Sequence, residues 1–542
     1  MSDIDYDYII VGAGTAGCTL ASRLTEDVGV RVLLLEAGGR DRDPLIHIPI
    51  GLGRMWKIRS HDWGYNSEPQ AHLNNRVIEL PRGKVLGGSS SINAMVYLRG
   101  DRGDYDRWAR NGLTQWSYAH VLPYFRRSEA WMGGEDSYRG GSGPVATRWS
   151  DPDDPIVPAV LEAARQAGYP LSGDINGASG EGFARAQSTL IRGHRASAAA
   201  TYLRAAHGRA GLSVHCGATA SRILVEGGRA RGIEYRQAGV LKTARASREV
   251  ILAGGAINSP QLMMLSGLGD PRQLGLHGIK VVASIPGVGQ NLQDHVAIGV
   301  GFARKESGPL AQALRLDRIA LAMLRSYFAG SGVASNVPGG PMALLRTRAG
   351  LDVPDLQISF RALARDAATW FPGTGRKFRD CFIFLPALLH PQSRGSVTLA
   401  SADPAQPPRI QLNLLAVDGD FRPLLEGMRI VREVGKQPAL ARFNGDEIFP
   451  GPSVNSEQAM RAYIRNTAGT FHHVCGTCRM GRDEASVVDP ELRVRGVEGM
   501  RVVDASVLPD PPGANTNACI FMLAEKAADL IRGRPPLPAA RL

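Results

Sequence analysis

The N-terminal part of the chain alternates between short apolar runs and one segment of helical periodicity. Residues 7–11 form a β-branched run, 12–17 a glycine-rich turn (GAGTAG), and 18–24 have the apolar spacing of an amphipathic helix. A second apolar run at 30–35 has the length of a buried strand and ends in Glu36. This order predicts a strand–helix–strand unit of the kind that binds dinucleotides.

Other periodic segments lie further along the chain. Residues 212–224 and 250–252 are expected to form strands, and 259–265 a short helix. The pattern at 519–531 predicts a C-terminal helix, and the residues from 535 onward are expected to form a loose tail.

The centre of the chain, from about residue 302 to 449, has a different pattern. Apolar and polar residues alternate at 356–360, an apolar run follows at 382–389, and turn-forming residues occupy 392–395. We expect a second, sheet-rich domain here. The chain shows no internal repeat and no low-complexity linker.

Composition is typical of a globular protein: of 542 residues, 44% are hydrophobic and 21% charged. The six cysteines are sparse and irregularly spaced, which argues against a disulfide framework. Residues 1–6 lack the basic and apolar parts of a signal peptide, and the first apolar run is too short to span a bilayer. We expect a cytoplasmic protein without an integral membrane segment.

The formal net charge of +12 is spread along the chain rather than gathered in a basic block. Nucleic-acid binding is therefore not expected. A modest attraction for anionic substrates or membrane surfaces stays open. No pattern predicts an oligomeric state.

The glycines of the turn have separate physical roles. They allow a tight turn, a close approach of the backbone to a pyrophosphate, and close packing of the helix on the strand. The amide groups of the helix N-terminus then face the phosphates. Glu36 lies 19 residues after Gly17, where a carboxylate can accept hydrogen bonds from ribose hydroxyls.

Six further segments have distinctive sequences: 81–93 (PRGKVLGGSSSIN), 255–269 (GAINSPQLMMLSGLG), 287–295 (GVGQNLQDH), 391–395 (PQSRG), 473–481 (HVCGTCRMG) and 515–518 (NTNA). Together they resemble the signatures of one family, the glucose-methanol-choline (GMC) oxidoreductases, and are closest to its bacterial alcohol and choline dehydrogenase-like branch. The resemblance runs in the family's order from about residue 5 to 532.

The resemblance implies an α/β (α+β) fold, with a Rossmann-like FAD-binding domain and a substrate domain built on an antiparallel sheet backed by helices. The expected FAD-binding domain is discontinuous, comprising 1–155, 205–300 and 460–535. The expected substrate domain comprises 156–204 and 301–459, and 536–542 form the tail.

The resemblance also implies FAD as the cofactor and assigns residues to it. Some family members carry a histidine, covalently bound to FAD, where this chain has Ile92, so we expect non-covalent FAD. No metal is expected. The expected FAD contacts are Gly12, Gly14, Thr15, Ala16, Gly17, Glu36, Ala37, Arg82, Gly87, Gly88, Ser89, Asn93, Ala94, Met95, Val96, Ala220, Asp504, Ala505, Asn515 and Thr516.

The chemistry of alcohol oxidation requires a hydride acceptor and a base for the hydroxyl proton, and the flavin supplies the first. By resemblance His473 is the base, because a neutral imidazole accepts a proton near physiological pH. Asn515 takes the partner position and is expected to orient the alcohol and stabilise developing negative charge.

Neighbouring residues leave alternatives. His472 would be the base if the alignment slipped by one residue, whereas in an extended segment its side chain points away from that of His473. The Cys475-x-x-Cys478 pair is interpreted as packing rather than as redox or zinc chemistry. His295 is interpreted as structural.

The substrate wall is expected around residues 357–361 and 365–371. The candidates are Phe360, Arg361, Trp370 and Phe371. An inward-pointing Arg361 or Arg365 would favour an anionic substrate, and solvent exposure of both is the alternative. No aromatic and acidic cage for a quaternary ammonium group is evident, so choline is not the expected substrate.

The predicted function is oxidation of a primary alcohol to the aldehyde, with hydride transfer to the flavin N5 and a quinone, another acceptor or oxygen as oxidant. Three alternatives remain. They are a non-redox lyase of the hydroxynitrile lyase type, a light-driven decarboxylase and a non-catalytic FAD-binding protein.

Overall fold

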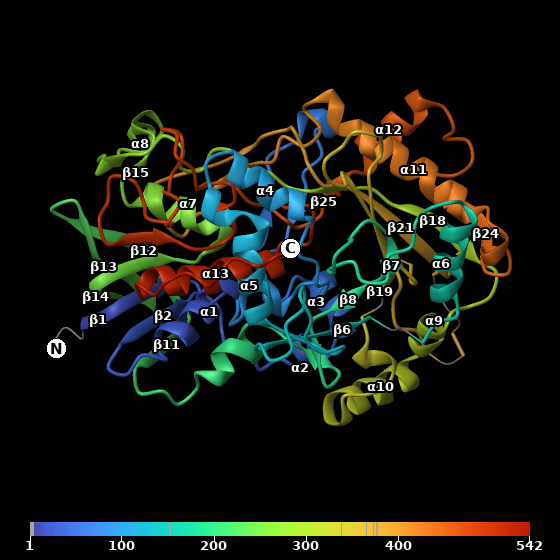
Figure 1. Ribbon diagram of the computed structural model, residues 1–542, viewed down its shortest axis with the longest axis horizontal. Coiled ribbons are helices and arrows are strands. Elements are labelled where there is room, and N and C mark those ends of the chain that lie inside the picture. The colour runs from blue at the N-terminus through green and yellow to red at the C-terminus, as the bar shows by residue number, and fades with distance from the viewer. Residues whose placement is uncertain (1–4, 151–152, 338, 365, 372, 375–377) are drawn as a thin grey trace.

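Two sheets organise the chain, one toward each end of the molecule (Figure 1). The computed structural model describes residues 5–150, 153–337, 339–364, 366–371, 373–374 and 378–542. The predicted α/β class is confirmed. The described helices are α1 (Thr15–Leu24), α2 (Pro44–His47), α3 (Gly51–Ile58), α4 (Arg102–Arg110), α5 (Tyr118–Ser128), α6 (Ile156–Gln166), α7 (Gly255–Leu265), α8 (Pro271–Leu276), α9 (Pro309–Ala313), α10 (Leu316–Ala329), α11 (Phe421–Gly435), α12 (Glu457–Thr467) and α13 (Asn517–Ile531).

The first sheet contains the predicted strand–helix–strand unit. Its strand order is β11-β2-β1-β14-β13-β12, with β26 paired to β14, and the pairings from β11 to β14 and to β26 are parallel. The strands are β1 (Asp5–Val11), β2 (Val32–Glu36), β11 (Leu212–Cys216), β12 (Ala218–Glu226), β13 (Arg229–Gln237), β14 (Val240–Leu252) and β26 (Met500–Val502). Every residue of β2 is buried, as expected for a parallel strand covered on both faces.

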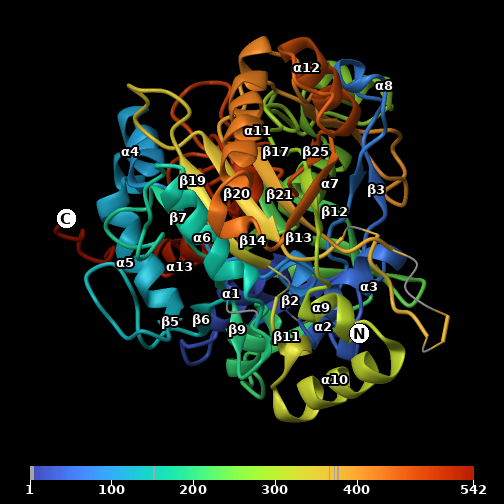
Figure 2. The ribbon, with the colours of Figure 1, turned by 90° about the vertical axis from the view of Figure 1, so that its right-hand side faces the viewer.

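The second sheet is antiparallel, and α11 lies across its outer face (Figure 2). The strands are β7 (Gly182–Arg185), β17 (Val296–Ala297), β18 (Val300–Arg304), β19 (Gly339–Leu345), β20 (Leu356–Arg361), β21 (Cys381–Leu388), β24 (Asn444–Phe449) and β25 (Gly469–Thr470). Leu356 and Pro386 contact Gly427 of α11, so alternate residues of these strands face the helix and the others face the interior between the sheets.

Short strands complete the described structure. They are β3 (Tyr65–Asn66), β4 (Glu79–Leu80), β5 (Glu129–Trp131), β6 (Val145–Trp149), β8 (Gln187–Ser188), β9 (Leu190–Ile191), β10 (His194–Arg195), β15 (Leu268–Gly269), β16 (Ala283–Ser284), β22 (Ser396–Thr398) and β23 (Arg409–Gln411). In β5, Glu129 is fully buried and receives hydrogen bonds from two buried arginines, Arg99 and Arg139, and from Thr147. Both guanidinium groups are out of solvent, so Glu129 is the buried counter-ion of Arg99 and shares Arg139 with Asp174.

Several elements differ from the predictions. The predicted strand at 212–224 is two strands, because Gly217 adopts a left-handed φ of 63° between β11 and β12. The helices predicted at 18–24 and 519–531 begin earlier, at Thr15 and Asn517. The tail is not loose: the Leu537 amide donates to the Tyr124 hydroxyl, and residue 540 bonds to residue 119. The tail therefore packs along α5.

Strands β17 and β25 pair with each other and with the second sheet, although both lie within segments that we assigned to the FAD-binding domain. His295 directly precedes β17, and His473 lies three residues after the end of β25. The domain boundaries given above stay a prediction.

Candidate active site

The glycine turn after β1 forms a cradle that larger residues cannot occupy. Gly12 has a φ of 103°, and a Cβ there would lie 2.5 Å from the carbonyl oxygen of Ala253. A Cβ on Gly17 would lie 1.9 Å from the Gly12 oxygen, and one on Gly88 would lie 2.7 Å from the Gly14 Cα. The predicted FAD segments 12–17 and 87–88 are therefore in direct contact, and the Gly14 side of the turn is open.

Glu36 stands at the end of β2 beside this cradle. Its Oε2 accepts the Ala13 amide at 3.0 Å and its Oε1 accepts the Gly38 amide at 2.8 Å. Burial raises the pKa of this carboxyl to about 7. Each oxygen keeps a further lone pair, so the carboxylate fits the role of a ribose-hydroxyl acceptor.

The other predicted FAD contacts come from several segments of the chain, and many of them are partly exposed to solvent. At the N-termini of α1 and α13, the Thr15 hydroxyl donates to Asn517 at 2.7 Å. The partly exposed residues are Gly12, Gly14, Thr15, Ala37, Arg82, Asn93, Ala94, Val96, Ala220, Ala505, Asn515 and Thr516, and Ser89 is exposed. Ala16, Gly17, Gly87, Gly88, Met95 and Asp504 are buried.

Asp504 has a defined structural role. Its Oδ2 accepts from the Gly255 amide at 2.8 Å and the Ser259 hydroxyl at 2.6 Å, so it caps the start of α7. Its Oδ1 accepts from Ser506. The side chain thus joins the family-like segment 255–269 to residues 504–506, and only the neighbouring backbone and Ala505 remain to face a cofactor.

Pro260 connects α7 to the segment that carries His473. Proline has no amide hydrogen, so the carbonyl of Ala256, four residues earlier, is left without its helical donor. That carbonyl accepts the Thr477 hydroxyl at 2.6 Å. The Thr477 hydroxyl of the HVCGTC segment therefore has a structural role, and no catalytic role is needed to explain it.

Arg195 fixes the segment that follows Gly88. Its Nη1 donates to the Asn93 carbonyl at 2.6 Å and to the Asn93 Oδ1 at 2.8 Å, and its Nε donates to the Ile46 carbonyl at 2.8 Å. The guanidinium is completely buried, and this burial lowers the pKa of Arg195 to about 9. The arginine therefore acts as a positioning residue for the loop of Asn93, Ala94 and Met95.

Arg82 and Asp294 place opposite charges close to His473. Nη1 of Arg82 donates to the His472 carbonyl at 2.8 Å, while its Nε and Nη2 are buried without a hydrogen-bond partner among the described residues. Asp294 accepts the His473 amide at 2.8 Å and the Thr470 hydroxyl, and burial raises its pKa to about 6. The unused donors of Arg82 fit a carbonyl-rich ring such as that of a flavin.

The structure brings the side chains of His473 and Asn515 together in the interior. Asn515 Nδ2 lies 3.0 Å from His473 Nε2, and Gln357 Nε2 donates to Asn515 Oδ1 at 3.3 Å. Burial, together with the neighbouring His295, His472 and Arg82, lowers the pKa of His473 well below its usual value. The imidazole is therefore neutral at physiological pH.

His295 continues this chain on the other side of the imidazole. The Nδ1 atoms of His295 and His473 are 2.9 Å apart, with the rings edge to face. His295 is completely buried, which lowers its pKa to about 3, and the backbone carbonyls of Leu389 and Pro512 border its ring. Its Nε2 is buried without a partner of normal geometry among the described residues.

These contacts define one direction of hydrogen bonding. The Asn515 amide nitrogen can only donate, so His473 Nε2 accepts and the proton of this neutral ring stands on Nδ1, where it is donated to His295 Nδ1. His473 Nε2 is then bare and accepts from the Asn515 amide, whose oxygen accepts from Gln357. The same direction fits all four residues, and it leaves His473 Nε2 as the basic atom.

His472 is placed differently. It has a left-handed φ of 68°, and its ring packs 5.6 Å from that of Trp56. Its backbone oxygen is the atom that Arg82 contacts. The two adjacent histidines thus point in different directions, and His473 is the one that meets Asn515.

Cys475 and Cys478 are buried thiols, and burial raises the pKa of both. Cys478 Sγ lies 3.9 Å from the Met263 sulfur. All six cysteines are free, and among the described residues no three His, Cys, Asp or Glu side chains are arranged to hold a metal ion.

The structure does not bring Phe360 to the site. It is 4% exposed and packs against Phe382 and Phe384 on the face of the second sheet that α11 covers. Strand alternation places the half-buried Arg361 on the opposite face, with Gln357. Our substrate assignment of Phe360 is therefore corrected, because the apolar residues of β20 face the helix.

The remaining predicted wall residues lie further out. Trp370 packs in an apolar cluster with Ile383 and Leu385 of β21, and its backbone bonds to the residues that begin α10. Phe371 is 58% exposed, so its side chain lies outside this packing. Arg365 lies outside the described residues.

Sequence reasoning placed Gln357 only in the segment of the substrate wall, interpreted His295 as structural and did not single out Arg195. Gln357 and His295 complete the hydrogen-bond chain, and Arg195 holds the loop of Asn93. The polar positions of β20 were a usable signal, because Gln357 and Arg361 alternate with Leu356, Ile358 and Phe360. The direction in which those polar residues point depends on where α11 packs, which the local pattern does not contain.

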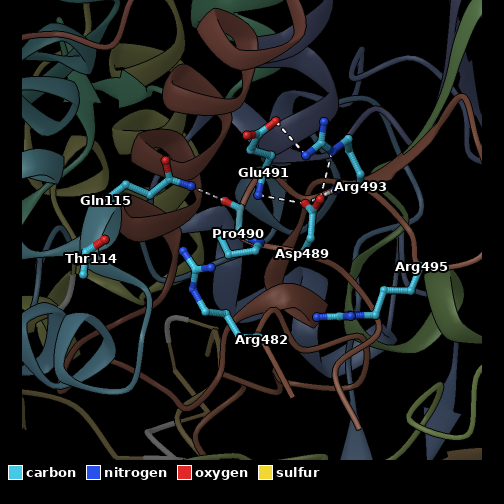
Figure 3. A pocket seen from close by; sticks show the side chains of 8 residues that line it. All are labelled: Thr114, Gln115, Arg482, Asp489, Pro490, Glu491, Arg493 and Arg495. Carbon is cyan, nitrogen blue, oxygen red and sulfur yellow. Dashed lines mark hydrogen bonds and ion pairs between the residues drawn. The ribbon is translucent and has the colours of Figure 1, made fainter. Parts of the chain in front are cut away.

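A separate surface pocket of about 410 Å³ lies between Thr114–Gln115 and the loop that carries Arg482 and Arg495 (Figure 3). In it Arg493 bonds to Asp489 at 2.8 Å. None of the predicted catalytic or cofactor residues lines this pocket.

The chain resembles known proteins over nearly its whole length. The GMC oxidoreductase family models match residues 6–297 and 391–524. Oxygen-dependent choline dehydrogenase of Photobacterium profundum is 41% identical, covering 98% of this chain and 94% of that protein. Mitochondrial choline dehydrogenase of Homo sapiens is 42% identical, covering 98% of this chain and 91% of that protein.

The solved structure of pyridoxine 4-oxidase from Mesorbium loti has a TM-score of 0.86 at 29% identity, with 98% and 100% of the two chains covered. The chain therefore belongs to the GMC oxidoreductase family.

Proposed function

We propose that this GMC oxidoreductase uses FAD to oxidise a primary alcohol to the aldehyde, with His473 as the base. The observation that carries the proposal is the neutral His473, held with Asn515 beside a glycine cradle of the shape a dinucleotide requires. Bound FAD would supply the acceptor for the hydride that leaves the carbinol carbon.

The protein's own groups account for the proton. Because Nε2 of His473 has one lone pair, the alcohol hydroxyl takes the place of the Asn515 amide there and gives its proton to Nε2. The Nδ1–H remains engaged with His295, so the imidazolium that forms is held in one orientation. Asn515 has a second amide hydrogen that is not used by His473, which suits it to bind the alcohol oxygen as negative charge develops there. Burial of the site strengthens both interactions.

The polar groups of β20 favour a neutral or anionic alcohol. Ser359 and Arg361 share the face of Gln357, so this face of β20 carries an amide, a hydroxyl and a guanidinium group. A quaternary ammonium substrate such as choline would meet a like charge there. We therefore keep choline as a test compound rather than as the proposed substrate, although two relatives are named choline dehydrogenases.

The FAD is proposed to be held without a covalent bond. Ile92, at the position where some family members carry a flavin-linked histidine, is 4% exposed and packs with Ile46, Met55 and Val85. Its side chain has no nucleophilic atom. Protein denaturation should release all of the flavin into the supernatant, and flavin that stays with the precipitate would contradict this.

The oxidant is proposed to be a quinone, another acceptor or oxygen, and the compartment the cytoplasm. Six free cysteines, five of them buried, support a reducing environment. Among the described helices, none is long and apolar enough to cross a membrane.

The experiment that tests the proposal is anaerobic mixing of the purified holoenzyme with a panel of neutral, anionic and cationic primary alcohols. Bleaching of the oxidised-flavin absorption with formation of one aldehyde per flavin is the expected result. Admission of air then separates rapid oxygen reoxidation from dependence on a quinone. Full FAD occupancy with no bleaching by any alcohol would contradict the proposal and favour the lyase alternative.

A further inference from the structure

Helix α10 presents its apolar residues to solvent rather than to the protein. Leu321, Leu324 and Phe328 are 68%, 57% and 80% exposed, and their spacing of three and four residues places them on one face. Ile319 and Ser326 are buried on the opposite face. The helix projects from the lower edge of the molecule in both ribbon views (Figures 1 and 2).

The apolar surface continues beyond both ends of the helix. At the C-terminal end, His194 of the β9–β10 hairpin bonds to the Tyr327 carbonyl at 3.0 Å, and the hairpin exposes Ile191. At the N-terminal end, the Leu316 amide bonds to the Trp370 carbonyl at 2.9 Å, next to the exposed Phe371. We call α10 with Ile191 and Phe371 the α10 surface.

Arginines surround this apolar stripe. Arg192, Arg318 and Arg325 are exposed, and none of them has a carboxylate within ion-pair distance among the described residues. The one acid on α10, Asp317, already pairs with Arg315 at 2.7 Å. The α10 surface is thus apolar at its centre and positively charged at its flank.

This combination selects one kind of partner. An amphipathic helix with an apolar face and arginines beside it lies in the interface of a bilayer, where side chains enter the acyl boundary and guanidinium groups reach phosphates. A second copy of this chain would bring a second set of arginines to the same contact, with no free acid on α10 to neutralise them. An anionic lipid surface meets both requirements.

We propose that the α10 surface docks the protein peripherally on membranes that contain anionic phospholipid. Fourteen residues are too few to span a bilayer, so the helix lies along the membrane surface. The N-terminal end of α10 contacts the apolar cluster of Trp370, Ile383 and Leu385. Ile383 and Leu385 lie on the face of β21 that is turned toward the site. Docking therefore places the outer end of that cluster at the bilayer.

Vesicle flotation of the full-length holoenzyme tests the proposal. The probes are vesicles of phosphatidylcholine alone and of phosphatidylcholine with phosphatidylglycerol in equal parts. The apolar variant is Leu321→Ser/Leu324→Ser/Phe328→Ser, and the charge variant is Arg318→Gln/Arg325→Gln. The matched control is Leu276→Ser, because Leu276 is 82% exposed on α8, far from α10 (Figure 1).

The parent and Leu276→Ser proteins should float with anionic vesicles, and much less with neutral ones. Loss of three inserted side chains should lower the partition coefficient more than about a hundredfold. Removal of two arginines should lower it about 25-fold, since one basic residue near an anionic surface changes binding about fivefold. Flavin absorbance and activity with a soluble dye acceptor should stay unchanged in all variants, which shows that they fold.

Three outcomes would overturn the proposal. They are absence of the parent from the anionic vesicle fraction, equal flotation of the parent and the apolar variant, and an apolar contact that proves to join two copies of the chain. Light scattering identifies the last, as a dimer of the parent that becomes a monomer in the apolar variant.

Discussion

Replacing His295 by phenylalanine tests whether a residue without direct access to the substrate controls the base. In the parent, the Nδ1 atoms of His295 and His473 are 2.9 Å apart. Phenylalanine fills the space of the imidazole but has no acceptor for the His473 Nδ1–H. A buried donor left without its partner costs about 1–3 kcal/mol. Because the imidazolium needs this contact more than the neutral ring does, we expect the flavin-reduction rate constant to fall about 5- to 150-fold.

The assay is anaerobic single-turnover reduction of the bound flavin at saturating alcohol. His295→Asn is the matched rescue, since its Oδ1 takes nearly the place of the imidazole Nδ1 and accepts the same hydrogen. It should recover most of the rate, whereas a general packing defect would impair both variants. Equal rate constants in the parent and His295→Phe would refute the assignment of His295 as a positioning residue.

Three further predictions concern the buried charge, the cradle and the pH dependence. Glu129→Gln should lower the free energy of unfolding by about 3–5 kcal/mol in chemical denaturation, because the buried Arg99 loses its counter-ion and the buried Arg139 keeps only Asp174, whereas the exposed Glu135→Gln should change it by less than about 1 kcal/mol. Gly12→Ala should yield protein with little FAD by absorbance ratio, whereas Gly275→Ala, which has open space around it, should bind FAD normally. The neutral form of His473 is the active one and its pKa is lowered, so kcat/KM should decline only below pH 6.5, and a decline that begins above this value would contradict the tautomer chain.

Local pattern predicted the dinucleotide unit well because its determinants are local. The β-branched run before Gly12, the glycine turn and Glu36 each follow from the conformations that neighbouring residues allow. His473 and Asn515 came from resemblance, and the structure brings them within 3.0 Å of each other across 42 residues of sequence.

The missed features depend on contacts between distant segments. We assigned Phe360 to the substrate wall. Which face of β20 is turned toward the site depends on which face α11 covers, and α11 lies some sixty residues later in the chain. His295 was interpreted as structural because it follows a turn in the 287–295 segment, and the sequence does not show that it meets His473, 178 residues away. Exposure of the apolar face of α10 likewise depends on what the rest of the fold leaves uncovered.

The most direct test of the account compares flavin reduction by the best alcohol in His473→Ala and His472→Asn under anaerobic conditions. Asparagine tolerates the left-handed backbone of residue 472, so the second variant is a fair neighbour control. If His473 is the base, the alanine variant binds FAD fully and its flavin bleaches at least about a hundredfold more slowly, since general base catalysis contributes on the order of 10²–10⁴. The control should bleach at the parent's rate. Parent-like bleaching in His473→Ala would contradict the central claim.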